Sequence, residues 1–313
     1  MGCVLPFRVS SVAYGPIGLV LLVVVAAIVW VLPPYYTGLI TLTGLYALVA
    51  IGLNLFMGYA GQVSLGQAAF FGVGAYTSAA LAVKAGVSPW FGMVLGAAAA
   101  ALVAYALSFV ALRLRENLLA LATLALGIVI NVVFNQWDFI GGSSGLKDIP
   151  GFRIGAYVFD QRAYAILAWA LVAIGIWFAG NLVRSNFGRS LIAISAGELG
   201  AQALGVHAER LKRQTFVLSA VYAGAAGAVY ASQASYIDPT SFSFLLSVNF
   251  VLMSVIGATV VVALGQILQN VVPIVLPSAR GDFQGFFLGV ILIAMLILLP
   301  RGITSRLGEA HRA

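Results

Sequence analysis

Residues 58–67 form a run of glycine, amide and hydroxyl side chains in an otherwise apolar part of the chain. The run reads GYAGQVSLGQ and contains no charged residue. Lipid cannot satisfy free backbone N–H and C=O groups, so non-helical backbone at membrane depth must be buried in protein or line a watery path. Two interpretations stay open: the run dips toward a translocation pathway, or it is a tight glycine turn at the cytoplasmic face. The candidate pathway residues in this run are Gly58, Tyr59, Gly61, Gln62, Ser64, Gly66 and Gln67.

Three asparagines, Asn54, Asn131 and Asn249, lie inside apolar segments. Each could contact the polar groups of a substrate or form a hydrogen bond between helices. We count Asn54 and Asn249 among the candidate pathway residues. No apolar segment holds a central Asp, Glu, Lys or Arg, whereas ion-coupled carriers usually place an ionisable group there. Any transport by this chain is therefore expected to draw its energy from elsewhere.

Catalytic and metal-binding patterns are absent from the sequence. The only histidines, His207 and His311, have no ligand cluster beside them, and Cys3 is the only cysteine. No nucleophile–histidine–carboxylate set, zinc-protease motif or P-loop occurs. We therefore expect no enzyme activity, no catalytic residue, no metal and no cofactor, and ATP hydrolysis would need a partner protein.

The composition explains where such a chain must fold. Of its 313 residues, 62% are hydrophobic and 8% are charged, whereas a soluble domain has about a quarter charged residues. The mean hydropathy is +1.06. With about 20 apolar residues per helical span, the chain has room for about ten spans. We expect an all-α polytopic membrane protein in which residues 1–313 form one transmembrane domain. This domain is expected to contact membrane lipid and to bind no nucleic acid.

The apolar runs predict the spans individually. They are Ile17–Leu32, Tyr36–Met57, Gln67–Val83, Trp90–Leu112, Leu118–Asn135, Tyr164–Leu182, Phe216–Ser235, Phe244–Leu276 and Phe283–Leu299. A broken or re-entrant segment is expected after the second. The stretch from Phe244 to Leu276 is too long for one helix across a hydrocarbon core of about 30 Å, so we expect two crossings there.

Lysine and arginine in the connections predict the orientation. Residues 183–213 carry five of these positive side chains, Arg184, Arg189, Arg210, Lys212 and Arg213. Positive loops stay in the cytoplasm. Residues 136–162 have balanced charges and are expected to face the periplasm. Both termini are then cytoplasmic.

Within the positive connection, residues 188–205 are rich in Ala, Leu and Glu, which favours a helix that Gly205 can cap. This helix could lie in a groove of another protein or pack on the chain's own helix ends. Elsewhere, Gly92 and Gly96 lie on one helix face, as do Gly281, Gly285 and Gly289. Such faces allow close helix packing, within the subunit or in a dimer.

Four motifs resemble one family. The run from Gly52 to Tyr76, the segment Gly141–Leu146, the segment Gly188–Gly205 and the segment Ser247–Met253 are similar to the inner-membrane permease of branched-chain amino acid ABC importers, of the LivM type. The resemblance covers about residues 36–302. A glycine-rich turn that usually follows the Ser-Val-Ile-Gly run of this family is missing after Gly257, so either the turn is abbreviated or the pore geometry differs.

The resemblance implies partners and roles. It implies a LivH-type second permease, two cytoplasmic ATPase subunits and a periplasmic amino-acid-binding protein. Residues 188–205 would be the helix that couples to the ATPases, and the coupling residues would be Gly188, Arg189, Glu198, Ala201 and Gly205. We expect Ala201→Glu to abolish ATPase association. The cargo would be leucine, isoleucine or valine; the alternatives are urea, short amides or other amino acids, or an autonomous channel or carrier.

Overall fold

The computed structural model describes residues 14–31, 33–112 and 116–256. Both termini, the expected second crossing within residues 244–276, the span at 283–299 and the Gly281–Gly289 face lie outside the described residues. The long helices are α1 (Tyr14–Val31), α2 (Pro34–Asn54), α3 (Gln67–Lys84), α4 (Pro89–Ala111), α5 (Glu116–Gln136), α6 (Gln161–Arg184), α9 (Ala208–Ala234) and α10 (Phe244–Ile256). The shorter helices are η1 (Leu55–Tyr59), η2 (Asp138–Ile140), η3 (Gly142–Ser144), α7 (Asn186–Ala196), α8 (Glu198–Ala203) and η4 (Pro239–Phe242). Two short strands, β1 (Arg153–Ile154) and β2 (Tyr157–Val158), pair antiparallel.

Each span predicted in the described residues coincides with a helix. Within those residues, five helices are long and apolar enough to cross a membrane: Tyr36–Tyr59, Pro89–Ala111, Leu118–Gln136, Gln161–Arg184 and Ala208–Ala234. The chain is therefore a multi-pass membrane protein. Helix α3 is not among these five, and most of its residues are buried against other helices. A helix surrounded by protein does not need an all-apolar surface toward lipid.

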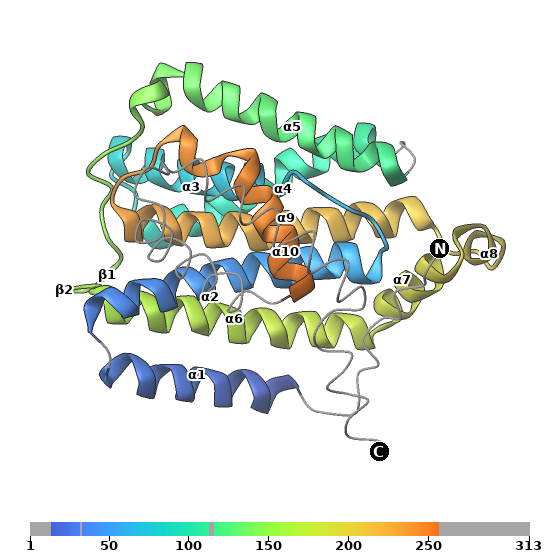
Figure 1. Ribbon diagram of the computed structural model, residues 1–313, viewed down its shortest axis with the longest axis horizontal. Helices are drawn as coiled ribbons and strands as arrows, with labels where there is room; N and C mark the ends of the chain where they lie inside the picture. The colour runs from blue at the N-terminus through green and yellow to red at the C-terminus, as the bar shows by residue number, and fades with distance from the viewer. Residues whose placement is uncertain (1–13, 32, 113–115, 257–313) are drawn as a thin grey trace, which may run out of the picture.

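Helix α9 is the centre of the bundle. It packs against α3 and α4 on one side and against α2 on the other, while α6 lies between α2 and α1 (Figure 1). Helix α10 crosses obliquely over α2 and α3. The core is thus built from α2, α3, α9 and α10, whereas much of the surface of α4 and α5 is exposed and apolar. An exposed apolar face is expected for helices that meet lipid or another membrane subunit.

Small residues let the three central helices touch. A Cβ on Gly96 of α4 would lie 2.6 Å from the carbonyl oxygen of Gly74 of α3. A Cβ on Gly74 would lie 2.2 Å from the carbonyl oxygen of Gly224 of α9. Gly92 and Gly96 are both buried against α3. Their shared face therefore serves packing within this subunit, the first of the two interpretations given by their spacing.

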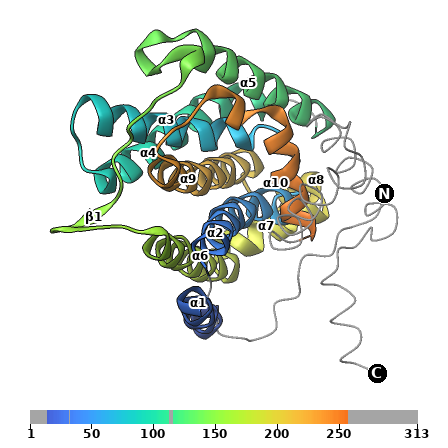
Figure 2. The ribbon, with the colours of Figure 1, turned by 60° about the vertical axis from the view of Figure 1, so that its left-hand side comes forward.

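The two ends of the bundle differ. One end, here called the loop end, carries residues 137–160 with the strand pair, joined to the chain after α9 by a bridge between Leu146 and Ile237 (Figure 2). The opposite end, here called the α8 end, carries α7 and α8 beyond the first turns of α9. Polar connections at both ends and apolar helices between them match a membrane-spanning bundle.

Candidate functional site

The break expected after the second span is present, with different limits. Helix α2 continues as the π-helix η1 over Leu55–Tyr59, and only residues 60–66 are non-helical. The break therefore begins later than predicted, since Gly58 and Tyr59 belong to η1, whereas Gln67 begins α3 as the predicted span Gln67–Val83 requires. The side chain of Asn54 explains part of this: its Oδ1 lies 2.3 Å from the position of a Cβ on Gly58, so the absence of that Cβ leaves room for the amide.

The non-helical residues return deep into the bundle. The Nε2 of Gln67 donates a hydrogen bond of 3.0 Å to the Oγ of Ser219, near the middle of α9. Gln62, Ser64 and Gln67 are at most 3% exposed. We call residues 60–66 the re-entrant segment, because they run from the α8 end of α2 to mid-bundle before α3 begins.

Hydroxyl groups from two other helices hold the end of this segment. The N–H of Leu65 donates to the Oγ1 of Thr123 on α5, and the N–H of Ala68 donates to the Oγ of Ser247 on α10, each at 3.0 Å. These two hydroxyls satisfy donors at the start of α3 that no helical carbonyl can reach. The backbone is therefore buried in protein, which is the condition for irregular structure at membrane depth.

Not all the candidate pathway residues come together. Ser64, Gly66 and Gln67 are buried at one place, while Gly61 and Asn54 are exposed near the α8 end. Asn249 is half-buried on α10, two residues beyond Ser247. The Nδ2 of Asn131 donates a hydrogen bond of 2.8 Å to the carbonyl oxygen of Pro239, so this asparagine forms a hydrogen bond within the bundle, as one of its two interpretations predicted.

The expected single helix at 188–205 is two helices, which corrects the sequence interpretation. Gly197 ends α7, and α8 starts again at Glu198. The new direction allows the Glu198 carboxylate to reach the Nζ of Lys212 on α9 at 2.7 Å. Gly205 follows α8 with φ +84°, a conformation that favours glycine, so the predicted capping role is confirmed.

The side chains of α8 divide into an inner and an outer set. Ala201 is only 3% exposed and packs with Ile194 and Ala208. Leu199 and Leu204 are 84% and 85% exposed. Ala201 is therefore on the inner side of α8, while the two leucines, which sequence reasoning did not single out, are the exposed apolar side chains here. Gly188 is buried beside Val183, and Arg189 is exposed and bonded to Asn186.

Helix α7 touches the start of the re-entrant segment. It contacts η1, and a Cβ on Gly61 would lie 3.7 Å from the Cβ of Ser195. Gly61 has φ +67°, so this turn needs a residue that tolerates the left-handed region. Helix α7 and the start of the re-entrant segment are therefore neighbours at the α8 end.

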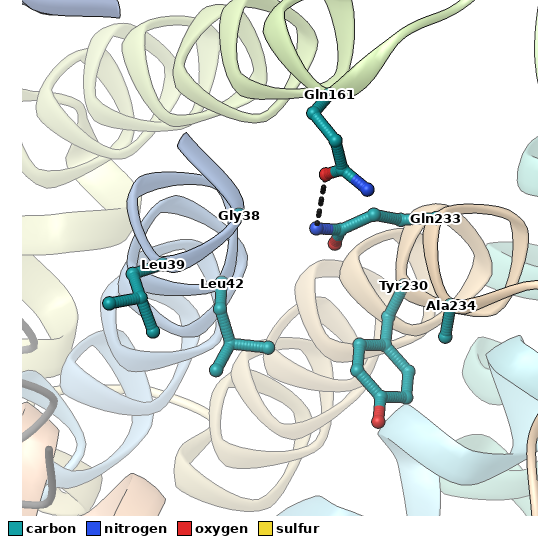
Figure 3. A pocket seen from close by; sticks show the side chains of 7 residues that line it. All are labelled: Gly38, Leu39, Leu42, Gln161, Tyr230, Gln233 and Ala234. Atoms are coloured by element: carbon teal, nitrogen blue, oxygen red, sulfur yellow. Dashed lines mark hydrogen bonds between the residues drawn. The ribbon is translucent and has the colours of Figure 1, made fainter. Parts of the chain in front are cut away.

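A cavity opens at the loop end. It has a volume of about 510 Å³ and is lined by Gly38, Leu39, Leu42, Gln161, Tyr230, Gln233 and Ala234 (Figure 3). The Nε2 of Gln233 donates to the Oε1 of Gln161 at 3.5 Å. Sequence reasoning missed both glutamines. Gln233 could have been noticed as an amide within the span Phe216–Ser235, but its proximity to Gln161 is a tertiary contact.

Apolar helices, a buried break after the second span and a helix pair at one end are the features of a polytopic membrane protein. Among the described residues, no group of three or more His, Cys, Asp or Glu side chains could hold a metal ion. The chain belongs to the family described as the permease component of branched-chain amino acid transport systems, whose model matches residues 35–297.

Curated relatives agree with this family. The chain is 28% identical over 291 residues to the high-affinity branched-chain amino acid transport system permease protein LivM of Escherichia coli, covering 84% of this chain and 68% of the relative. It is 24% identical over 288 residues to the permease protein BraD of Pseudomonas aeruginosa, with 85% and 94% covered. It is 24% identical over 296 residues to the probable permease protein LivH of Methanocaldococcus jannaschii, with 86% and 91% covered. No solved structure matches the chain.

Proposed function

We propose that this chain is one of two permease subunits of an ATP-driven importer that moves leucine, isoleucine and valine across a bacterial inner membrane. Membership of the branched-chain amino acid permease family supports the cargo. Relatives named LivM and LivH support a system with a second, related permease. Residues 1–313 would act as one transmembrane domain.

The orientation follows from charge. The α8 end holds the positive side chains of residues 183–213, so it faces the cytoplasm and two ATPase subunits. The loop end, with residues 136–162, faces the periplasm and an amino-acid-binding protein. Both termini lie on the cytoplasmic side.

The observation that carries the proposal is the geometry of α7 and α8. Leu199 and Leu204 protrude from α8, and α7 rests on η1 and Gly61. An exposed leucine on this short helix and a second directly after it offer apolar surface to a groove in another protein. An ATPase that moves α8 would move α7 and, through Gly61, the re-entrant segment. The buried position of Gln67 and Ser64 then corresponds to a closed pathway.

The ion pair of Glu198 and Lys212 adds a second connection. Lys212 is on α9. One turn further along that helix, Phe216 packs on Phe56 at 5.1 Å between ring centroids. Two turns further along, Ser219 accepts the hydrogen bond from Gln67. Movement of α8 would thus reach the pathway along both α7 and α9.

Competition for uptake tests the cargo. Cells that lack other leucine importers are given this permease with its neighbouring importer genes, and labelled leucine uptake is measured with excess unlabelled isoleucine, valine, urea or acetamide. We expect isoleucine and valine to compete, and urea and acetamide to have no effect. Competition by urea or acetamide alone would assign the alternative cargo instead.

A further inference from the structure

We propose that the cavity at the loop end binds the ammonium and carboxylate groups of an amino acid with an uncharged apolar side chain, using the amides of Gln161 and Gln233. This inference rests on the proposed function and adds a binding site to it. The cavity lies at the first residues of α2 and α6 and the last of α9, so it is on the periplasmic side in the proposed orientation. Its volume of about 510 Å³ is within the range of about 300–1,000 Å³ typical of small-molecule sites.

The two glutamines supply the polar chemistry. Their one mutual hydrogen bond is long, 3.5 Å, and the Oε1 of Gln233 is buried with no hydrogen-bond partner among the described residues. An amide offers both a carbonyl acceptor and an NH₂ donor. Rotation of the Gln233 side chain toward the cavity would bring its oxygen to an ammonium group, while the NH₂ groups could donate to a carboxylate. Figure 3 shows the two amides facing one another between α6 and α9.

The remaining lining selects for an uncharged side chain. Leu39 and Leu42 present an apolar surface from α2, and none of the seven lining residues is charged. The nearest basic residue along the chain, Arg162, has its guanidinium over the ring of Trp30, 5.6 Å from the centroid. A zwitterion is neutral overall and suits such a lining. A lysine or glutamate ligand would bring a further charge without a counter-ion, which is costly to desolvate.

The cavity has an aromatic floor. Tyr230 lines the cavity and packs on Phe71 at 5.4 Å between ring centroids. Phe71 also contacts Tyr46 at 6.1 Å and Phe250 at 5.5 Å. Phe71 is one helical turn after Gln67 on α3, so this aromatic cluster links the cavity lining to the helix that follows the re-entrant segment.

Protection from thiol labelling tests the site in the assembled importer. An Ala234→Cys variant, made in a Cys3→Ser background, is treated with a maleimide in proteoliposomes that contain the permease pair and the ATPases. We expect millimolar leucine to slow the labelling about tenfold, and lysine or glutamate to leave the rate unchanged. Gln136→Cys, at the exposed end of α5, is the control and should be labelled equally with and without leucine.

Two further variants locate the ligand. Gly38→Leu should abolish protection by filling the cavity, because the only atom within 4 Å of a Cβ there is the Oε1 of Gln161, at 3.8 Å. Gln233→Leu should abolish it by removing the amide. Leucine transport by the Ala234→Cys importer without any protection would overturn this inference and leave the proposed function intact. Absence of leucine transport by the unmodified importer would overturn both.

Discussion

At the scale of single residues, the buried end of the re-entrant segment depends on close contacts with α5 and α10. Thr123 accepts a hydrogen bond from Leu65, and Ser247 accepts one from Ala68. Gly66 lies between these two contacts, against the backbone of Thr123. The start of α3 is thus fixed by side-chain hydroxyls and backbone atoms of two other helices.

Gly66→Ala is expected to impair both folding and uptake. The new Cβ would lie 2.6 Å from the carbonyl oxygen of Thr123, so α5 must shift away. Overpacking of this kind costs about 1–3 kcal/mol. Thermal unfolding of the purified importer in detergent, together with leucine uptake, measures the effect. The matched control is Gly127→Ala on α5, whose Cβ would be 4.0 Å from Gly66 and should change little. Equal behaviour of the two variants would contradict this packing.

Sequence reasoning found part of the residue-scale picture. The polar run at 58–67 stood out because glycine and amide residues are unusual between apolar spans, and Ser64, Gly66 and Gln67 are indeed buried together. Their partners Thr123, Ser219 and Ser247 come from three helices that are distant along the chain. Ordinary serines and threonines within helices carry no local signal, so these contacts could not be predicted from spacing.

At the scale of elements, α8 projects from the end of the bundle beyond the other helices that the structure describes. Its inner face is closed by Ala201, while Leu199 on the helix and Leu204, the residue directly after it, are exposed. Substitutions on the two sides of α8, and at Leu204 directly after it, are therefore expected to have different effects.

Leu199→Glu and Leu204→Glu are each expected to reduce co-purification of the ATPase subunits about tenfold or more, since an apolar anchor worth at least about 1.4 kcal/mol would be lost. The melting temperature of the permease should not change. Ala201→Glu, by contrast, should lower the melting temperature because it places a carboxylate among Ile194 and Ala208. Gln202→Glu, exposed on the same helix, is the control. Normal co-purification of both leucine variants would refute the anchor.

Glu198→Gln is expected to loosen α8 from α9. The variant leaves the ammonium of Lys212, a residue that is 7% exposed, without its counter-ion. We expect a loss of about 1 kcal/mol of local stability, because the carboxylate itself is partly solvated. Faster amide hydrogen exchange over residues 198–206 would report this loss. Glu209→Gln, an exposed change on α9, serves as control. The double variant Glu198→Lys with Lys212→Glu should restore slow amide exchange. An exchange rate in Glu198→Gln as slow as in the unmodified chain would contradict the role of this ion pair in holding α8 to α9.

The helices themselves were well predicted. Long apolar runs predicted α1 to α6 to within about three residues, because a span needs about 20 apolar residues and the polar ends are distinct. Helix α9 ends where predicted but begins at Ala208, two turns before the predicted Phe216, because its first turns are polar and charged. The division of residues 188–205 into α7 and α8 was not predicted. The helices divide at Gly197, and Glu198 just after it contacts Lys212 of α9, a tertiary contact that the local sequence does not reveal.

At the scale of the whole molecule, the described bundle holds the two proposed contact regions at opposite ends. The cavity with Gln161 and Gln233 is at the loop end, and the exposed leucines are at the α8 end. Between them lie the aromatic floor around Phe71 and the re-entrant segment. The composition predicted the membrane environment, and the scarcity of intramembrane charge predicted an external energy source. Neither could predict the cavity, which requires the assembled ends of α2, α6 and α9.

The most direct test of the account is the energy requirement of leucine flux in proteoliposomes. The complete importer, with both permeases, both ATPases and the binding protein, is compared with this chain alone, in the presence and absence of ATP. We predict leucine accumulation only for the complete importer with ATP, and no flux through the chain alone. Leucine flux through the chain alone, without ATP, would contradict the account and identify an autonomous channel or carrier.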